Sequence, residues 1–522
     1  MSDDSSFATS KLSPEQRDNQ KQYANIDVLI GHLYLAAIDA SMVEAGFRMP
    51  TSVVHADDAP ETVLTPHDLA AGYWKDSDQP MEGEWVTWVE RPGADGTNGG
   101  RTIEYYPDYN GQSGVQRRVG TTSDRYVSKF DDIRKQVHLE IEKFLDMPDP
   151  QAAADVANIY TGISGQLDPG YGTMTASIGE IKTHSDVLKG TAAETYKTSF
   201  LNCFGLVLDS YCGLAGVLAQ FMGAQAAMWA AARADVIGVI KSATDAYNTY
   251  ATKPPAGSGF NWDVLIQIGK VVLAAAGIFT PEGGAVKKVA SLGGAILETL
   301  PKEEEKVSHG IKSPEDVFDH IYKAGLASVN EQVTDVEDQI YTDAGSVMGS
   351  ISGSRSAVRQ NWQLPIAVAD LSGEKHITWE YEDVNDICHV DMPNIVAKLD
   401  QLVSTARIED ADLVCSVLHH DGLGRGHYGP GLALQELNDM FCDLLGFFRE
   451  QVSRGGENLW DAYQFACNAD DATRAALAAS TANLEGLTSL NGYQDPWIYT
   501  TTPAPTSTDQ QMYGDWLKAL ND

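Results

Sequence analysis

The chain has 522 residues, enough for several domains or for one long, well-buried core. Its 73 acidic and 37 basic residues give a formal net charge of −36, which excludes a protein whose main task is to grip nucleic acid. The same charge disfavours electrostatic docking on an anionic membrane, while 43% hydrophobic residues favour a folded chain.

Residues 1–49 are expected to form an N-terminal helical segment that starts at the Ser-Pro-Glu sequence of residues 13–15, a cap followed by a first-turn proline. Residues 50–125 differ in character. They hold strand-like runs at 84–89 and 102–106 on either side of a glycine-rich loop. We therefore expect a small irregular or β-containing insert. The N-terminus has no basic region, apolar core or cleavage site of an ordinary secretory signal.

A helical hairpin is predicted over residues 126–253. Apolar residues recur at steps of three, four or seven from Val156 to Ile181, which is typical of one helix face. Pro169 and Gly170 should interrupt this helix. After a break near residues 188–190, a second periodic run continues to about Tyr247. Two long helices joined by a short glycine turn form an antiparallel pair.

The second half begins with a Gly/Ala-rich apolar block and linker at 254–310. A helix starting at residues 313–316 and a strand at 376–381 are expected within 311–390. Residues 391–480 repeat the hairpin plan, with a glycine-rich turn from Asp421 to Gly431, and 481–522 are expected to be a flexible tail. The return helix carries a heptad-spaced, helix-pairing seam of Leu434, Leu437, Phe441, Leu444 and Phe448.

The first turn resembles the WXG100 family of type VII (ESX) secretion substrates of actinobacteria. That family has Trp-x-Gly at its hairpin turn, followed by small residues and an aromatic. Here Leu188 takes the tryptophan position, and Gly190, Ala192, Ala193 and Tyr196 fit the rest. A glycine at a helix end supplies the left-handed conformation that other residues resist.

The C-terminal hairpin is similar to small ESX-secretion-associated proteins. Val390-Asp391 precedes its first helix, and Asn458-Leu459 with Ala462-Tyr463 precedes the acids at 470–471. These resemblances imply a mainly α-helical, elongated protein without cofactors. They also imply a location outside the cell or at the envelope, reached by a non-Sec route.

Cys388 and Cys467 lie at opposite ends of the C-terminal hairpin. If the turn centres near residue 425, Cys388 faces about residue 462 on the return helix, so a disulfide between these two cysteines could clamp the open end. Such a bond needs an oxidising compartment, which agrees with export. The six cysteines include no Cys-x-x-Cys pair that would indicate a zinc site.

The densest group of potential metal ligands is His419, His420, Asp421 and His427, which could bind zinc or nickel. Its spacing matches no standard site and it coincides with the predicted turn, so a polar, exposed interhelix loop is favoured and no metal is expected. The glycines at 422, 424 and 426 follow a helix, whereas a dinucleotide loop follows a strand.

Three functional hypotheses remain. The leading one is a non-enzymatic exported protein that acts by helix-mediated assembly with copies of itself or with a helical partner. The alternative is a pore-forming or membrane-acting effector that uses the apolar segments 200–232 and 264–300, because the uncharged run from Ser210 to Ala232 is long enough to span a bilayer. An enzyme with its site in 50–125 is the third, although no hydrolase, zincin or P-loop motif occurs.

Overall fold

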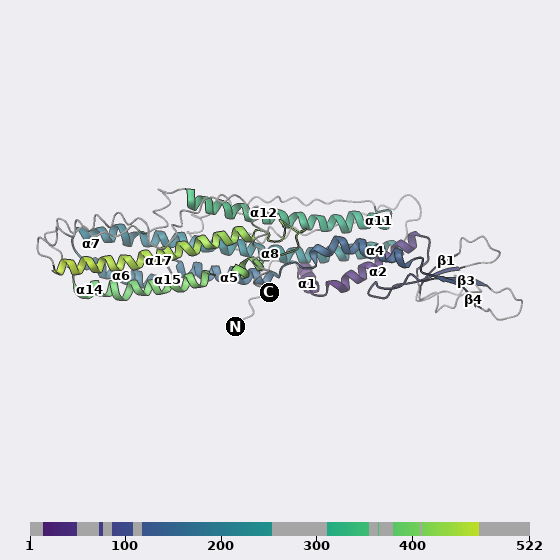
Figure 1. Cartoon of the computed structure of the whole chain (residues 1–522), viewed down its shortest axis with the longest axis horizontal. Coiled ribbons are helices and arrows are strands. Elements are labelled where there is room, and N and C mark those ends of the chain that lie inside the picture. Colours follow the sequence, from purple (N-terminus) through teal and green to yellow (C-terminus); the bar gives the residue numbers. More distant parts are fainter. Residues whose placement is uncertain are drawn as a thin grey trace.

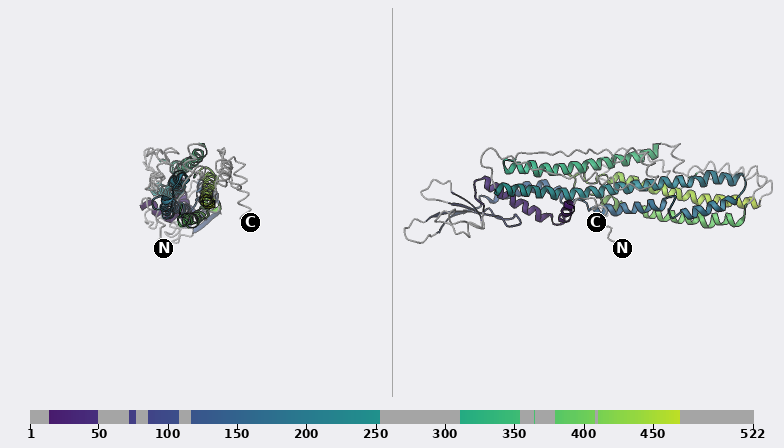
Figure 2. Two further views of the ribbon diagram at one scale, coloured as in Figure 1. Left: turned by 90° about the vertical axis from the view of Figure 1, so that its left-hand side faces the viewer. Right: turned by 180° about the vertical axis from the view of Figure 1, so that it is seen from behind.

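The structure is a computed structural model, and it describes residues 14–49, 72–76, 86–107, 117–252, 311–353, 364, 379–407 and 410–468. Long helices run side by side in an elongated bundle, with a small sheet at one end (Figures 1 and 2). The expected mainly α fold with a β-containing insert is confirmed. The apolar block around 264–300 and the C-terminal tail lie outside the described residues.

Among the described residues, the N-terminal part contains two helices and a four-stranded antiparallel sheet of order β1-β2-β3-β4. These elements are α1 (Pro14–Tyr23), α2 (Ile26–Glu44), β1 (Gly72–Asp76), β2 (Val86–Glu90), β3 (Thr102–Pro107) and β4 (Arg117–Ser123). The runs predicted at 84–89 and 102–106 correspond to β2 and β3. The sequence pattern missed β1 and β4.

A buried carboxylate fixes the sheet to the bundle. Asp39 of α2 accepts a 2.5 Å hydrogen bond from the Tyr73 hydroxyl of β1 and a 2.9 Å hydrogen bond from Nε of Arg91. Burial raises the pKa of Tyr73, so its hydroxyl stays protonated and remains a donor. A small separate core surrounds this point and contains Ile38, Met42, Phe47, Tyr73, Val89 and Phe130.

The expected hairpin over 126–253 is present, and the chain continues as α4 (Val127–Ile141), η1 (Glu142–Phe144), α5 (Pro150–Leu167), α6 (Thr175–Val187), α7 (Thr191–Thr195), η2 (Tyr196–Leu201) and α8 (Asn202–Thr252). Asp149 caps α5 by accepting from the Gln151 amide at 3.0 Å. The interruption predicted at Pro169 separates α5 from α6. The 51-residue helix α8 is about 77 Å long and passes through most of the bundle.

The second half is also helical, and its elements are α11 (Pro314–Val317), η3 (Phe318–Lys323), α12 (Ala324–Gly353), α14 (Tyr381–Asp386), η4 (Ile387–Asp391), α15 (Met392–Ala406), α16 (Asp410–Cys415) and α17 (Gly431–Asn468). The strand predicted at 376–381 is wrong at its described end, because Tyr381 opens α14. Glu382 and Asp383 occupy the first turn of that helix, where carboxylates favour the helical state.

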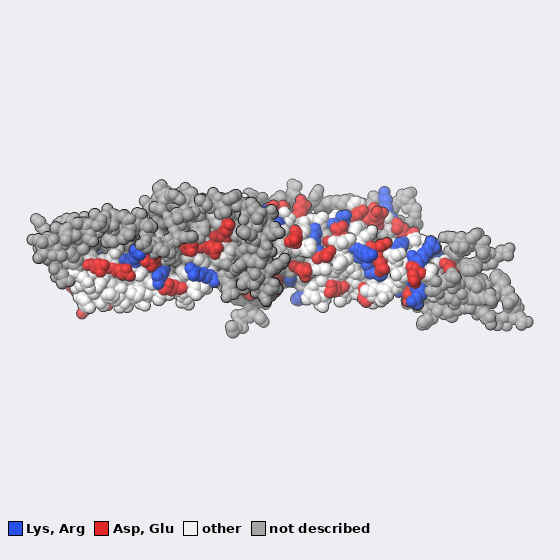
Figure 3. Space-filling model, viewed as in Figure 1, with Lys and Arg blue, Asp and Glu red and all other residues white. Residues whose placement is uncertain are grey.

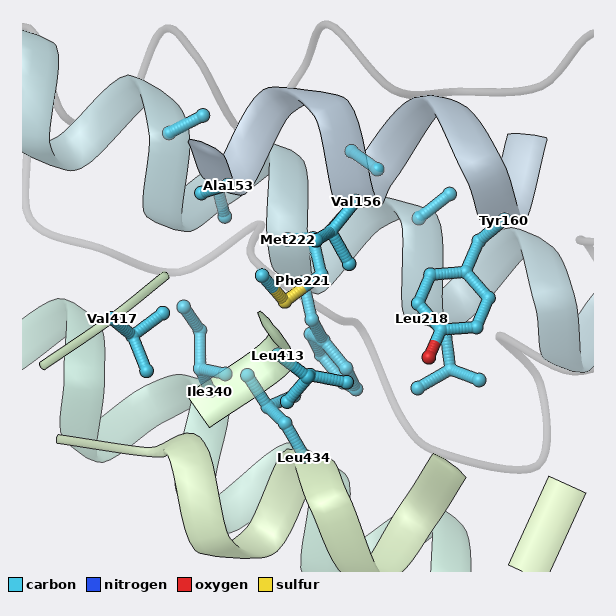
Figure 4. Packing of buried hydrophobic residues seen from close by; sticks show 14 of the residues in the cluster. Ala153, Val156, Tyr160, Leu218, Phe221, Met222, Ile340, Leu413, Val417 and Leu434 are labelled. Carbon is cyan, nitrogen blue, oxygen red and sulfur yellow. The ribbon is translucent and has the colours of Figure 1, made fainter. Parts of the chain in front are cut away.

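One continuous hydrophobic core extends from Tyr23 to Leu459 and joins both hairpins. In Figure 4, α5 and α8 contribute Ala153, Val156, Tyr160, Leu218, Phe221 and Met222, and the second half contributes Ile340, Leu413, Val417 and Leu434. Buried hydrogen bonds cross the same boundary, since the Tyr160 hydroxyl donates to Asn438 Oδ1 at 2.8 Å. The two hairpins therefore share one core rather than forming separate units.

Candidate functional site

The first hairpin turn forms where the sequence predicted it. Gly190 has φ of +124°, a conformation that side-chain-bearing residues rarely adopt, and its carbonyl accepts from the Glu194 amide at 3.0 Å. Leu188 and Tyr196 are buried beside it, as is Ala193, and nothing is described of the Ala192 side chain. The residues that carried the family resemblance thus build a closed turn.

The predicted helix-pairing seam has a different role from the expected one. Leu434, Leu437, Phe441, Leu444 and Phe448 are all fully buried within the chain. The helix α17 packs against α15, α12 and α8, and the Phe448 ring stacks on Tyr211 at 5.4 Å. Because the chain itself covers this seam, it offers no surface to a partner, and its expected use in assembly is corrected to an internal contact.

The expected Cys388–Cys467 disulfide is not supported by the structure. Cys388 is a buried, free thiol, and its carbonyl lies opposite Gly456 of α17. Cys467 lies eleven residues further along the same helix, about 16 Å away by helical rise. A disulfide joins Cα atoms less than about 7 Å apart. The prediction assumed a turn centred near residue 425, which would place Cys388 opposite residue 462. In the structure Cys388 lies opposite Gly456, and α17 continues beyond this point to Asn468.

The long apolar helix α8 is the leading functional feature. From Tyr211 to Ala232 every residue except Gln220 is buried. Within the described residues, Ile26–Glu44 and Ala193–Thr252 are the two helices long and apolar enough to cross a membrane by length and composition. Both are largely covered in the bundle, and the core helix of a soluble protein passes the same test.

Two buried polar side chains, Glu337 and His419, lie within the hydrophobic core beside α8. His419 Nε2 lies within hydrogen-bonding distance of Glu337 Oε1, at 2.9 Å, and both side chains are completely buried. The Trp229 ring of α8 lies 4.9 Å from the His419 ring, and its indole N–H donates to Gln225 at 3.1 Å. We call Glu337, His419 and the loop of residues 419–429 the polar latch. It joins α12 to the start of α17 directly against α8.

Glycines let the latch loop wrap closely around the carboxylate. The Arg425 amide donates to Glu337 Oε2 at 2.8 Å, and the Gly424 amide donates to Asn330 at 2.9 Å. A Cβ at Gly424 or Gly429 would overlap the Glu337 carboxylate, and both glycines have positive φ. The expectation of an exposed loop is correct for His420 and His427 but wrong for His419, which is 3% exposed.

Glu337, the partner of His419 that the sequence analysis did not identify, was marked by one signal in the sequence. Glu337 lies among Val333, Val336 and Ile340, on the buried face of α12, where an apolar residue is expected. Its partner is 82 positions away in the chain, so spacing alone could not reveal the pair. In the described part of the chain, no group of three or more His, Cys, Asp or Glu side chains is placed to hold a metal ion.

The outer surface near the latch is charged. The Arg425 guanidinium pairs with Asp338 and lies 4.1 Å from the centre of the Tyr341 ring. On the face drawn in Figure 3, Lys and Arg lie interspersed with Asp and Glu over the described helices. The surface near the latch is therefore charged, while the interior around α8 is apolar.

A second histidine–carboxylate pair lies at the bundle end remote from the sheet. His184 Nδ1 of α6 is 2.9 Å from Asp383 Oδ1 of α14, and we call this pair the clasp. The hydrogen bond to the Asp383 carboxylate raises the pKa of His184. Nearby, the Trp379 indole donates to the Lys189 carbonyl at 3.2 Å. The clasp thus joins the first hairpin to the second beside the Gly190 turn.

Comparisons with protein-family models, with curated proteins and with solved structures found no match to this chain. The buried apolar helix, the polar latch and the clasp are the main features of packing and hydrogen bonding in the described residues.

Proposed function

We propose that this is a non-enzymatic, membrane-acting protein that keeps long apolar helical segments covered in a bundle and exposes them at a bilayer. The observation that carries the proposal is the run from Tyr211 to Ala232 in α8, which is buried almost throughout. As a helix it measures about 33 Å, and the hydrocarbon core of a bilayer is about 30 Å thick. The run has no charged residue.

The ends of the second apolar segment support the same proposal. The helix α8 ends at Thr252, and α11, which starts at Pro314, packs beside it. The described residues on either side of the segment 253–310 therefore lie close together in the bundle. The sequence of this segment over 264–300 consists of two apolar runs around a Gly-Gly pair, the pattern of an apolar helical hairpin.

The polar latch supplies a means of control. A buried carboxylate–imidazole pair contributes little net stability compared with apolar packing, but it specifies one arrangement of the helices around it. Opening α12 would separate Glu337 from His419 and uncover α8 along the same line. Water or lipid headgroups would then form hydrogen bonds with Glu337 and His419. These hydrogen bonds would lower the free energy of the opened state relative to one in which the two groups have no partner.

A disulfide across α12 and α8 tests the proposal. A Cβ built at Gly325 lies 3.5 Å from the Cβ of Val239, within the normal range for a disulfide. The double substitution Gly325→Cys with Val239→Cys should therefore lock α12 to α8 when oxidised. We expect the oxidised protein to release no dye from phosphatidylcholine vesicles and the reduced protein to release it as the wild type does.

The reduced form of the same variant is the matched control, because it differs only in the bond. Wild-type protein treated with the same oxidant controls for the natural cysteines. Equal dye release from the oxidised and reduced forms would show that α12 need not move. Absence of release from every form, at several pH values and lipid compositions, would overturn the membrane proposal itself.

A second proposal concerns the route to the membrane. The turn from Leu188 to Tyr196 closes with Gly190 at its tip, in accord with the resemblance to type VII substrates. This favours export by an ESX system. Fractionation of the native host into culture filtrate, envelope and cytosol, with and without an active ESX ATPase, tests it. A protein that stays in the cytosol of both strains would exclude this route.

A further inference from the structure

A surface groove of about 340 Å³ lies between α17 and the helical stretch formed by η4 and α15. Met392 and Val396 contribute apolar side chains to its wall. Gly456 keeps the opposing helix close, because a Cβ there would lie 3.3 Å from Met392 Cβ. A groove of this size is at the lower end of the range for small-molecule sites, so it suits a ligand of headgroup size.

Aromatic rings hold Trp460, one of the groove-lining residues, in position. The His389 ring centre lies 4.4 Å from the Trp460 ring, Tyr463 lies at 5.6 Å and Tyr381 at 6.2 Å. Tyr381 remains 57% exposed. An aromatic group at the surface that is not buried by its own chain is a common feature of ligand sites.

The charge of the groove favours one sign of ligand. Asp400, Glu457 and Asp461 line it, and none of the described lining residues is Lys or Arg. Arg449 neutralises Asp400 through a 2.9 Å contact, whereas Glu457 and Asp461 stand one helical turn apart on α17. Like charges at this spacing repel each other, and a bound cation would relieve that repulsion.

The inner wall of the groove is neutral. Burial raises the pKa of Cys388 to about 12, so this lining thiol carries no charge at neutral pH.

We propose that this groove binds a small organic cation of the quaternary ammonium class. Its charged head lies between the Trp460 ring and the carboxylates of Glu457 and Asp461, and its alkyl part lies on Met392 and Val396. Aromatic faces attract such cations electrostatically, and they do so without the strong hydration that keeps a primary ammonium in water. An anion would meet the two carboxylates, and a neutral apolar ligand would leave their repulsion in place.

The same ammonium chemistry occurs on free choline-type solutes and on the headgroup of phosphatidylcholine. We therefore design the test with both sources. The full chain, labelled with 5-fluorotryptophan, is titrated with choline and followed by fluorine NMR, with the Trp460 signal assigned by its loss in Trp460→Phe. We expect choline to shift this signal and 3,3-dimethylbutan-1-ol, its uncharged isostere, to bind at least about tenfold more weakly.

Two variants separate charge from shape. Glu457→Gln combined with Asp461→Asn should weaken choline binding by about tenfold or more, since the shape of the groove is retained. Ala397→Phe, at an exposed lining position of α15, should block the groove while keeping every charge. Glu331→Gln, at an exposed site on α12, is the matched control and should bind choline normally.

The outcomes show whether the groove binds the cation and whether the cation is a free solute or a lipid headgroup. A shift with free choline identifies a soluble cation as sufficient, and a shift only with phosphatidylcholine vesicles identifies a lipid headgroup. Equal binding of the neutral isostere, equal response to phosphatidylglycerol vesicles, or unchanged affinity in the double variant would overturn the proposal. Dye release is measured separately, so loss of membrane activity and loss of cation binding are distinguishable.

Discussion

The polar latch and the clasp contain the same two chemical groups in different surroundings. In the latch, Glu337 and His419 have no exposed side-chain surface, and the Arg425 amide of the loop donates one further hydrogen bond to the carboxylate. In the clasp, 26% of the His184 side chain and 21% of the Asp383 side chain remain exposed. Water can replace a lost partner in the clasp but not in the latch.

This difference in burial explains why we expect loss of the latch pair to lower the free energy of unfolding more than loss of the clasp pair. A buried charged group that loses its partner keeps the full cost of desolvation, whereas a partly exposed one is hydrated instead. The latch lies midway along α8, where any opening must separate it. The clasp lies at the bundle end, where local opening leaves most of the core intact.

The largest expected effect comes from Glu337→Ala. It leaves the His419 ring and the Arg425 amide without their acceptor in the core. We expect the free energy of unfolding to fall by about 3–5 kcal/mol, measured by urea denaturation followed by circular dichroism. Glu331→Ala, at an exposed site on the same helix, should change it by less than about 0.5 kcal/mol. Similar losses in both variants would contradict the latch.

The next effect comes from Gly424→Ala. Its backbone has φ of +54°, and the new methyl group would overlap Glu337 Oε2. We expect about 1–2 kcal/mol of backbone strain plus about 1–3 kcal/mol from the overlap. Gly426→Ala is the control, because it has φ of +96° but its nearest neighbour is 3.8 Å away. Equal melting temperatures of the two variants would show that the loop does not press on the carboxylate.

A smaller effect is expected at the turn beside the clasp. Gly190→Ala forces a side chain into a rare conformation and should lower the free energy of unfolding by about 1–3 kcal/mol. Gly179→Ala, at an open position on α6, should raise it by up to about 1 kcal/mol because alanine favours helix. Thermal unfolding of both variants measures the difference, and a shift of the same sign in both would refute the turn geometry.

The smallest effect concerns the clasp and pH. The Asp383 hydrogen bond raises the pKa of His184, and charges on Asp391 and Asp386 raise it further. A raised histidine pKa stabilises the fold fully below the unfolded value of 6.5, and this stability is lost as pH rises through the folded value.

Wild type should therefore exceed His184→Gln in unfolding free energy at about pH 5, by less than about 1 kcal/mol, and the two should converge at about pH 9. Denaturant titrations at the two pH values measure this difference. A gap that widens toward alkaline pH would contradict the assigned role of Asp383.

Local signals predicted a large part of the fold. Pro169 ended a helix because proline blocks continuation, and the capping box of Ser313 with Asp316 started α11 as expected. Both depend on neighbours within a few residues, as does the Gly190 turn. The strand expected at 376–381 is wrong at residues 379–381, its described end, because a short apolar run does not by itself distinguish a strand from a helix.

The sequence by itself determined where the helices start, stop and turn, and that their apolar residues needed cover. Only the tertiary structure decided what covers them. The seam from Leu434 to Phe448 found its partners within the chain, and His419 found Glu337, 82 positions away. Helix ends depend on local hydrogen bonds and backbone angles, whereas the choice of packing partner depends on how distant apolar surfaces fit together in three dimensions.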